Sequence, residues 1–225
     1  MKPIHVGIIP DGNRRWAKSH GIAEYLAHST PGAYSNLSSI FNTARTEGIK
    51  FLSLWAFSTE NWDREKRELT ELIGVIERGL DNFLLYSSKD RYTFKIIGQR
   101  QKFSDRFISK VNELEESTKD YNEIKIILGL SYGGREEILE AVNNAIKKGK
   151  SIDEFEFGNY LDTARIPDPD LIIRTGGEKR LSGFMPFQSI YSELIFLDKL
   201  FPDFTSQDLI DSIKEYENRK RRFGK

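Results

Sequence analysis

The sequence predicts an α/β protein with a mostly parallel central sheet of about six strands flanked by helices, as one domain over residues 1–225. Short apolar, β-branched runs alternate with longer segments in which apolar residues recur every three or four positions. Neither a linker-like stretch nor an internal repeat interrupts this alternation. Strands that alternate with helices pair in parallel, so their carboxyl ends meet at one edge of the sheet, where such folds bind ligands.

Each expected strand is an apolar run closed by turn residues. The strands cover residues 5–9, 49–57, 92–97, 124–130, 171–173 and 190–197. Helices are expected over residues 14–20, about 37–44, 64–86, 102–117, 136–148, 152–161 and 206–222, with a loop before residue 37. Leu69, Leu72, Ile76 and Leu80 give the long 64–86 segment its helical period. The 136–148 segment begins with acids and ends with lysines, the order that a helix dipole favours.

Composition and charge exclude several classes of protein. Hydrophobic residues make up 38% and charged residues 30% of the 225 residues, which is typical of a globular chain. The 34 basic residues balance the 34 acidic ones, so the chain lacks the footprint of a general nucleic-acid binder. The absence of cysteine excludes disulfides and thiolate metal sites, and three histidines argue against a multi-histidine zinc site.

Hydropathy places the chain outside the membrane-spanning class. No apolar run approaches the roughly 20 residues that a bilayer-spanning helix needs. The first apolar run is too short for a signal peptide, because Pro10 and Asp11 follow it at once. We therefore expect a cytoplasmic protein, for which peripheral contact with a membrane stays open.

The turn after the first strand has the features of a phosphate site. Pro10, Asp11, Gly12 and Asn13 stop the strand, and the helix that follows presents unpaired backbone N–H groups and the positive end of its dipole. Arg14 and Arg15 come next, and arginine matches phosphate oxygens best. A carboxylate in an anion site makes sense if a divalent metal links it to the phosphate. An N-cap, a turn glycine and a solvated arginine face would also explain this fragment on its own.

Polar segments follow four of the expected strands: residues 11–13, 58–62, 132–135 and 174–178. Their position at equivalent strand ends predicts a functional cleft. The candidate anion binders there are Arg15, Arg64, Arg174, Arg180 and Arg222, and the candidate metal or proton-handling groups are Asp11, Glu60, Glu178 and Glu193. This set fits one or two diphosphates with a hard metal ion, and no Ser-His-Asp set or Walker-type phosphate loop accompanies it.

The chain resembles the cis-prenyltransferases of the undecaprenyl diphosphate synthase type. The matching stretches are HVGIIPDGNRRWAK (5–18), AFSTENWDR (56–64), SYGGREEI (131–138), DLIIRTGGEKRLSGF (170–184), YSELIF (191–196) and NRKRRFG (218–224), in family order from end to end. The resemblance implies repeated addition of isopentenyl diphosphate to an allylic diphosphate such as farnesyl diphosphate, with cis geometry. It also implies Mg²⁺, a homodimer, and an apolar tunnel walled by the 64–86 helix; plain core packing is the alternative for that helix.

The resemblance assigns roles to individual residues. Asp11 would handle Mg²⁺ and assist departure of the allylic diphosphate, and Asn61 would orient or relay the isopentenyl proton, since an amide is a poor base. Glu193 would be the second residue associated with the metal. Substrate binding would involve Gly12, Asn13, Arg14, Arg15, Trp16, His28, Ser58, Thr59, Glu60, Trp62, Arg64, Arg174, Arg180, Leu181, Ser182, Arg222 and Gly224. The Arg222–Gly224 element would reach the active site of the partner subunit.

Several positions depart from the family pattern. Glu24 stands where the family has an arginine, and an acid near a diphosphate is unfavourable. An extra residue follows His28 before the next glycine, and Lys179 replaces a histidine associated with the metal. Three alternatives therefore stay open: a synthase with a shorter product, a non-catalytic scaffold subunit of the same fold, and a nucleotide- or phosphosugar-binding α/β enzyme. The resemblance favours a long-chain polyprenyl diphosphate as the product, with undecaprenyl diphosphate for a cell-wall lipid carrier as the expected one.

Overall fold

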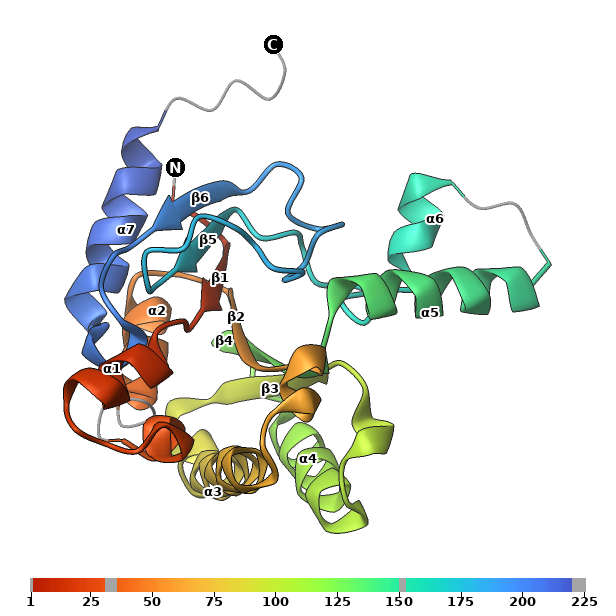
Figure 1. Cartoon of the computed structure of the whole chain (residues 1–225). Helices are drawn as coiled ribbons and strands as arrows, with labels where there is room; N and C mark the ends of the chain where they lie inside the picture. Colours follow the sequence, from red (N-terminus) through yellow and green to blue (C-terminus); the bar gives the residue numbers. More distant parts are fainter. Residues whose placement is uncertain (1, 31–35, 150–152, 220–225) are drawn as a thin grey trace.

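A computed structural model of the 225-residue chain describes residues 2–30, 36–149 and 153–219 (Figure 1). Within these residues, six strands alternate with helices and short 3-10 turns. In chain order the elements are β1 (His5–Ile9), α1 (Asn13–Ser19), η1 (Glu24–Ser29), α2 (Leu37–Thr46), β2 (Phe51–Ser58), η2 (Thr59–Asp63), α3 (Lys66–Asp90), β3 (Tyr92–Ile97), η3 (Arg100–Lys102), α4 (Asp105–Thr118), β4 (Ile124–Tyr132), α5 (Gly134–Lys147), α6 (Glu154–Gly158), β5 (Leu171–Arg174), β6 (Glu193–Phe196), η4 (Phe201–Asp203) and α7 (Ser206–Asn218).

The strands form one sheet in the order β3-β4-β2-β1-β5-β6, and every neighbouring pair is parallel. The predicted α/β class and the six-stranded sheet are therefore confirmed. β1 lies between β2 and β5, with Val6 paired in register with Leu52 on one side and Leu171 on the other. All five residues of β1 are buried, which is why its sequence is a continuous apolar run and not an alternating one.

Four helices cover one face of the sheet. The larger apolar core combines β1–β6 with α2, α3, α4 and α7, whose apolar side chains recur at helical spacing. The opposite face carries a smaller cluster, and the irregular segment around Phe184 and Met185 packs on Ile9, Ile127 and Ile172 there. The sequence did not indicate this covering segment, because an irregular segment has no hydrophobic periodicity.

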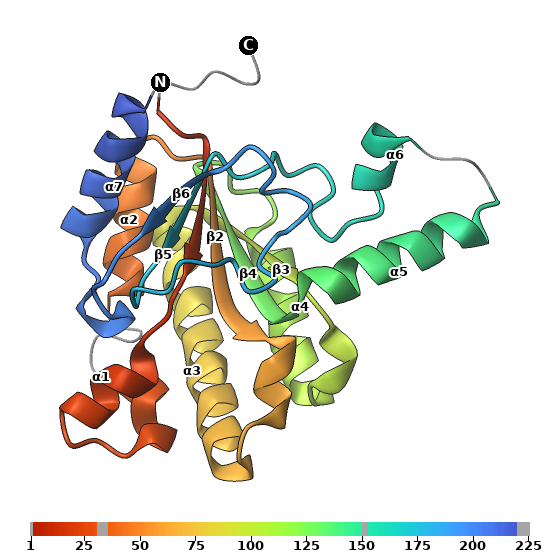
Figure 2. The same ribbon diagram turned by 45° about the horizontal axis from the view of Figure 1, so that its top comes forward.

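Helices α5 and α6 extend away from the body of the molecule (Figures 1 and 2). The first turn of α5 packs on the irregular segment, where the Gly134 N–H donates to the Gly183 carbonyl at 2.9 Å. Further along the helix, Leu139 and Ile146 are 62% and 69% exposed. α5 therefore presents apolar side chains to solvent within this chain.

Most predicted element boundaries agree with the structure to within a few residues. The predicted 92–97 strand is β3, while the predicted 64–86 helix starts two residues later, at Lys66, because Arg64 is extended (φ −71°, ψ 159°) after η2. α7 ends at Asn218, before the predicted residue 222, since Arg219 is extended (φ −75°, ψ 135°). In the part of the chain that the structure describes, no helix combines the length and apolar composition needed to cross a bilayer.

Candidate active site

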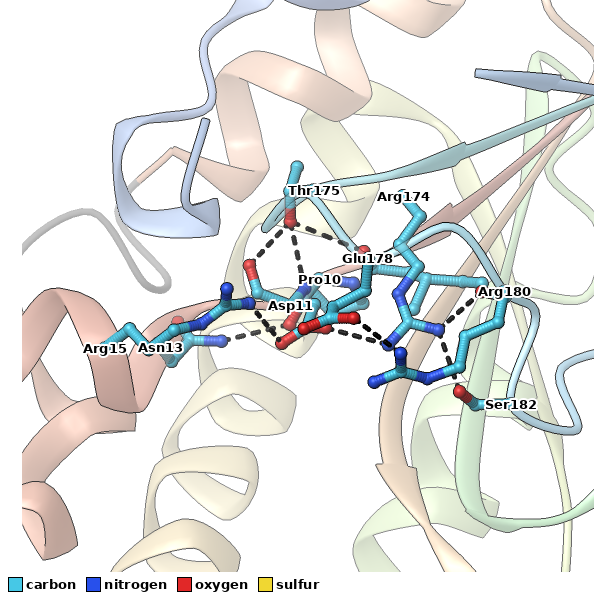
Figure 3. Close-up of polar contacts among 10 residues, drawn as sticks. Pro10, Asp11, Asn13, Arg15, Arg174, Thr175, Glu178, Arg180 and Ser182 are labelled. Atoms are coloured by element: carbon cyan, nitrogen blue, oxygen red, sulfur yellow. Dashed lines mark hydrogen bonds and ion pairs between the residues drawn. The ribbon is translucent and has the colours of Figure 1, made fainter. Parts of the chain in front are cut away.

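The candidate site lies where the order of the strands along the chain reverses within the sheet. From β1 the chain continues on one side of the sheet to β2, and it later returns on the other side as β5. The segments that follow β1 and β5 therefore diverge and leave a crevice at the carboxyl ends of the two strands. Asp11 follows β1 and Arg174 ends β5, and their side chains meet across this crevice (Figure 3).

Asp11 is fixed by both its side chain and its backbone. Arg174 Nη2 donates to Asp11 Oδ2 over 2.8 Å, and Arg15 Nη2 lies 3.4 Å from Oδ1. Thr175 Oγ1 accepts from the Asp11 N–H at 2.9 Å and donates to the Asp11 carbonyl at 2.7 Å. Because Thr175 is fully buried and follows β5 directly, the sheet itself sets the direction of the Asp11 carboxylate.

Two glycines allow the chain to approach itself this closely. Gly12 has φ +104°, and a Cβ there would lie 2.7 Å from Leu200 Cδ2. Gly176 has φ +87°, and a Cβ there would lie 2.6 Å from Arg15 Nη2. A side chain at either position would combine backbone strain with a steric clash, so glycine is required at both.

A cavity of about 490 Å³, the α1 pocket, opens on one side of Asp11. It has four cationic side chains against two carboxylates, and it is lined by Pro10, Asp11, Gly12, Asn13, Arg14, Arg15, Lys18, Glu24, His28 and Arg64. Arg14 donates to Glu24 Oε2 from Nε at 3.0 Å and from Nη2 at 2.6 Å. Arg64 Nη1 donates to Glu68 Oε1 at 2.7 Å. The pocket keeps a positive balance suited to an anion, although all three of its arginines are already paired, Arg15 with Asp11 itself.

His28 is a neutral member of the α1 pocket. Burial lowers the pKa of His28 from 6.5 to about 3, and the nearby charges of Arg64 and Arg14 add to this effect. Its Nε2 lies 3.1 Å from Arg64 Nη1. Since a guanidinium can only donate, Nε2 is the unprotonated acceptor, and His28 orients Arg64 without adding charge.

A second cavity of about 470 Å³, the β5 pocket, opens on the other side of Asp11. It is lined by Ile9, Pro10, Asp11, Trp55, Ser58, Glu60, Asn61, Arg174, Arg180 and Ser182. Arg174 is only 5% exposed, and its Nη1 donates to the Arg180 carbonyl and, at 2.8 Å, to Ser182 Oγ. The Arg180 side chain is 60% exposed and pairs with Glu178 (Figure 3). The pocket thus combines one fixed arginine with one that reaches into solvent.

A smaller cavity of about 90 Å³ lies between the two pockets, with a polar side and an apolar side, and is called the apolar cavity after the latter. It shares Asn13, His28 and Arg64 with the α1 pocket, and Trp55 and Asn61 with the β5 pocket. Its remaining walls are mainly apolar and include Leu37, Leu54, Ala56 and Phe201. An uncharged group held here would face both anion pockets.

The described core is packed where the sequence predicted a tunnel. Leu72, Ile76 and Leu80 of α3 are at most 3% exposed and lie in the same core cluster as Leu37 and Leu54, which line the apolar cavity. In that cluster the rings of Phe41, Phe83 and Phe94 contact one another, with centroids 4.9–6.5 Å apart. The α3 face therefore serves as core packing in this conformation.

The donor atoms around Asp11 suit a hard divalent cation. The Asp11 side chain is 28% exposed, and the neighbouring Asn13 Oδ1 is buried without a hydrogen-bond partner. Mg²⁺ takes oxygen ligands and often binds through one or two carboxylates, with phosphate oxygens completing its coordination. Among the described residues, no three His, Asp or Glu side chains cluster to hold a metal alone. Asp11 therefore fits a metal that a bound diphosphate helps to coordinate.

The structure brings together most of the predicted site residues. Those in the α1 pocket are Asp11, Gly12, Asn13, Arg14, Arg15, His28 and Arg64, and those in the β5 pocket are Ser58, Glu60, Asn61, Arg174, Arg180 and Ser182, with Asp11 common to both. Asn61 Oδ1 accepts from the Ser58 N–H at 3.0 Å, which identifies the oxygen of this amide. The amide nitrogen of Asn61 is left as a donor. These groupings follow from the shared carboxyl edge of the parallel strands.

Four predicted substrate-binding residues lie outside both pockets. Trp16 stacks on His20 and donates to Asp203, while Trp62 packs on Phe57 and donates to Ser131 Oγ at 2.8 Å. The Thr59 hydroxyl is buried without a partner, and Leu181 packs against the smaller core cluster. None of these four lines the α1 or the β5 pocket. Their contact with substrate stays a prediction.

Glu193 does not lie beside Asp11 within one chain. It opens β6 in register with Leu171, whereas the Asp11 end of the sheet corresponds to Arg174 and Phe196. At about 3.3 Å per residue, Glu193 starts roughly 10 Å short of that edge. It accepts from Arg219 Nη1 at 2.8 Å. Sequence reasoning grouped it with Asp11 because register cannot be read from the sequence. Arg222 and Gly224 lie outside the described residues.

Three contributors were missed as site residues. Thr175 aims Asp11, Glu68 holds Arg64, and Lys18 lines the α1 pocket. Lys18 follows Arg14 by one helical turn, and Thr175 follows Arg174 at a strand end, so spacing and position could have indicated both. Glu68 is 6% exposed and four residues after Arg64, a spacing that suggests an ion pair but not a role in this site.

Comparison with known families adds an independent line of evidence. Residues 9–224 match the family model described as "Putative undecaprenyl diphosphate synthase". An isoprenyl transferase of Thermotoga maritima is 42% identical over 230 residues, covering 99% of this chain and 97% of the relative. An isoprenyl transferase of Aquifex aeolicus is 38% identical, covering 99% and 96%.

Two solved structures have the same architecture over the whole chain. Lavandulyl diphosphate synthase from Lavandula x intermedia, crystallised with dimethylallyl diphosphate, superposes with a TM-score of 0.94 at 35% identity and covers 100% of this chain and 99% of its own. A "probable undecaprenyl diphosphate synthase" from Campylobacter jejuni superposes with a TM-score of 0.85 at 32% identity, covering both chains completely.

Proposed function

This chain belongs to the undecaprenyl diphosphate synthase family and is a prenyltransferase, and we propose that it condenses isopentenyl diphosphate with an allylic diphosphate, farnesyl diphosphate first, with cis geometry. One observation carries this proposal. Asp11 and Pro10 line two separate cavities, each with two or more cationic side chains, and a small cavity with one apolar wall lies between them. Two diphosphates on opposite sides of one carboxylate would bring their hydrocarbon parts together in the apolar space.

The α1 pocket suits the allylic diphosphate. Arg14, Arg15 and Lys18 offer cationic donors on successive turns, and Arg64 approaches from the opposite wall. When this substrate ionises, its C–O bond breaks and the diphosphate leaves with the electron pair. Cationic donors that stabilise the departing anion lower the barrier of this step. Asp11 would hold Mg²⁺, which when bound neutralises charge on the diphosphate.

The β5 pocket suits isopentenyl diphosphate. Arg174 and Arg180 would hold the diphosphate, and Ser182 Oγ keeps Arg174 in place. The double bond of isopentenyl diphosphate attacks the allylic carbon, and the new C–C bond forms as a proton leaves the isopentenyl group. Because the Asn61 oxygen is engaged by the Ser58 N–H, Asn61 acts as a donor that orients a diphosphate. A diphosphate oxygen then receives the proton.

The exposed apolar face of α5 supports the proposed homodimer. Leu139, Val142 and Ile146 are three to four residues apart, 38–69% exposed, and on a helix that projects from the body (Figure 1). A second copy would cover this stripe and, as the family resemblance implies, receive Arg222 and Gly224 at its active site. The variant Leu139→Glu with Ile146→Glu tests this, since it should convert a dimer to a monomer in sedimentation.

Product length has two candidate answers. The family description favours a long polyprenyl diphosphate, and we propose undecaprenyl diphosphate for a cell-wall lipid carrier, released by peripheral contact with a membrane. The packed core favours a shorter product, because the apolar cavity of about 90 Å³ is far below the roughly 300 Å³ of a small ligand pocket. A long product requires Phe41, Phe83 and Phe94 to separate.

The deciding experiment is a condensation assay on the purified chain. It supplies Mg²⁺, farnesyl diphosphate and radiolabelled isopentenyl diphosphate, and resolves the products by chain length. We expect a product ladder that a chelator abolishes, and a loss of at least about 100-fold in Asp11→Asn, which keeps the shape of the side chain. A ladder that stops after a few additions supports the shorter product. No incorporation by a folded protein contradicts the enzyme and favours the scaffold.

A further inference from the structure

Arg14 and Arg64 of the α1 pocket are paired with carboxylates of unequal burial. Arg64 is held by Glu68, whose side chain is 8% exposed, whereas Arg14 is held by Glu24, whose side chain is 45% exposed. Glu68 is buried, so it cannot move away without exposing its ion pair with Arg64. Glu24 lines the cavity and is nearly half exposed, so it can turn into solvent at little cost.

Glu24 occupies one of the two forked edges of Arg14, the edge formed by Nε and Nη2. Both the Nε and the Nη2 of Arg14 donate to Glu24 Oε2, at 3.0 and 2.6 Å. Arginine binds phosphate and carboxylate through the same forked edge, so one guanidinium edge cannot serve both groups at once. The second carboxylate near this arginine, that of Glu68, lies 3.8 Å from Nε and is directed at Arg64.

From this geometry we infer that Glu24 is a displaceable internal anion that competes with the allylic diphosphate for Arg14 and so sets the affinity of the α1 pocket. This inference rests on the proposed function, since it assigns the competing anion to that same site. Glu24 keeps Arg14 oriented while the pocket is empty and yields the forked edge on binding. The negative charge of Glu24 then lies beside the bound diphosphate. After the reaction, this charge favours release of the inorganic pyrophosphate from the α1 pocket.

The charge at position 24 can be separated from its hydrogen bonds. Glu24→Gln keeps a side-chain oxygen that accepts from Arg14 but removes the charge. Breaking a half-exposed ion pair costs little, so we expect Glu24→Gln to bind inorganic pyrophosphate roughly two- to fivefold more tightly. In the Arg14→Gln background, the same change should have less than half of that effect, because the contested edge is gone.

Titration calorimetry with inorganic pyrophosphate and Mg²⁺ tests the inference without turnover. The matched control is Glu47→Gln, which removes a half-buried acid paired with Lys2 at 2.8 Å, outside the residues that line the pocket. Tighter binding by Glu24→Gln, unchanged binding by the control and a reduced effect without Arg14 support the inference. In the condensation assay, Glu24→Gln should show a lower KM for the allylic substrate. Its kcat should also be lower, because the inorganic pyrophosphate product leaves more slowly.

Two results would overturn the inference and leave the proposed function standing. Equal pyrophosphate affinity in wild type and Glu24→Gln shows that the charge does not compete. If Glu24→Ala binds pyrophosphate more weakly while Glu24→Gln binds it as the wild type does, Glu24 serves only to hold η1 against α1. If wild type itself binds no pyrophosphate, the α1 pocket is not a diphosphate site and the proposed function fails with the inference.

Discussion

The α1 pocket and the β5 pocket share Asp11 but are built differently. Two of the three arginines of the α1 pocket, Arg14 and Arg15, lie on the surface of α1 and are about half exposed. The central arginine of the β5 pocket ends a strand, and its side chain is 6% exposed. The α1 pocket therefore binds mainly with adjustable side chains, whereas the β5 pocket has one arginine that the sheet fixes beside the exposed Arg180.

This difference matches what each pocket would receive during chain growth. Isopentenyl diphosphate is the same molecule in every cycle, so a rigid pocket around Arg174 costs no adaptability. In the proposed reaction the allylic substrate grows by one unit in each cycle. The elongated chain must then bring its diphosphate into the α1 pocket before the next addition. Half-exposed arginines with displaceable partners suit such an exchange. If rigidity belongs to one pocket and adaptability to the other, substitutions in the two pockets should differ in their effects on stability and on KM.

The largest effect is expected at Arg174. Arg174→Gln removes the ion pair with Asp11 at 2.8 Å and the hydrogen bonds to Ser182 and the Arg180 carbonyl. We expect condensation to fall at least about 100-fold and the free energy of unfolding to fall by roughly 2–3 kcal/mol. Denaturant unfolding and the condensation assay measure both. An inactive variant with unchanged stability would show that Arg174 is no more structural than the α1 arginines.

A smaller effect is expected at Thr175, which acts only through Asp11. Thr175→Val keeps the shape but removes the hydroxyl that bonds the Asp11 N–H and carbonyl. We expect a loss of about 1–2 kcal/mol in stability and of roughly tenfold in kcat, with KM for both substrates little changed. Thr175→Ser restores the hydroxyl and should recover kcat. A raised KM without a change in kcat would contradict the assignment of Thr175 to aiming Asp11.

The sequence was informative wherever a local rule decides the structure. Apolar runs located all six strands, and the rule that parallel strands share a carboxyl edge correctly predicted that Asp11 and Arg174 lie at one cleft. The glycine at position 12 follows from a turn that needs positive φ. Motif resemblance then supplied the reaction, which neither composition nor periodicity could indicate.

The features that escaped prediction depend on how separate elements meet. The pairing of Arg14 with Glu24 requires α1 to lie against η1, and the covering of the second face by Phe184 requires an irregular segment. Glu193 was grouped with Asp11 although register puts it at the other end of its strand. Side-chain partners across elements are set by tertiary packing, which a single sequence does not encode in any short pattern.

A change confined to binding is expected at Arg15. This side chain is 49% exposed, and its contact with Asp11 is long, at 3.4 Å. Arg15→Gln should raise the KM for the allylic substrate by about tenfold, the value of one charge-assisted hydrogen bond. Stability and the KM for isopentenyl diphosphate should stay unchanged. If both KM values rose together, the two pockets would not act as separate sites, and the contrast between them would fail.

The smallest effect is a pH dependence that His28 gives to the α1 pocket, since the β5 pocket has no histidine among its lining residues. Burial keeps His28 neutral and lowers its pKa to about 3, whereas in the unfolded chain it titrates near 6.5. Below pH 6.5, His28 therefore binds a proton in the unfolded state but stays unprotonated in the folded state. The stability due to neutral His28 is complete above pH 6.5 and is lost as the pH falls toward 3.

Comparing wild type with His28→Asn isolates this contribution, because the pKa of buried His5, also lowered, to about 4, affects both proteins equally. Between pH 7 and pH 5.5, we expect the free energy of unfolding to fall by about 1 kcal/mol more in the wild type than in the variant. Denaturant melts at fixed ionic strength measure the difference. Parallel pH profiles would mean that His28 takes up a proton in the folded state. Arg64 would then lose its acceptor in acid, and the α1 pocket would change shape with pH while the β5 pocket did not.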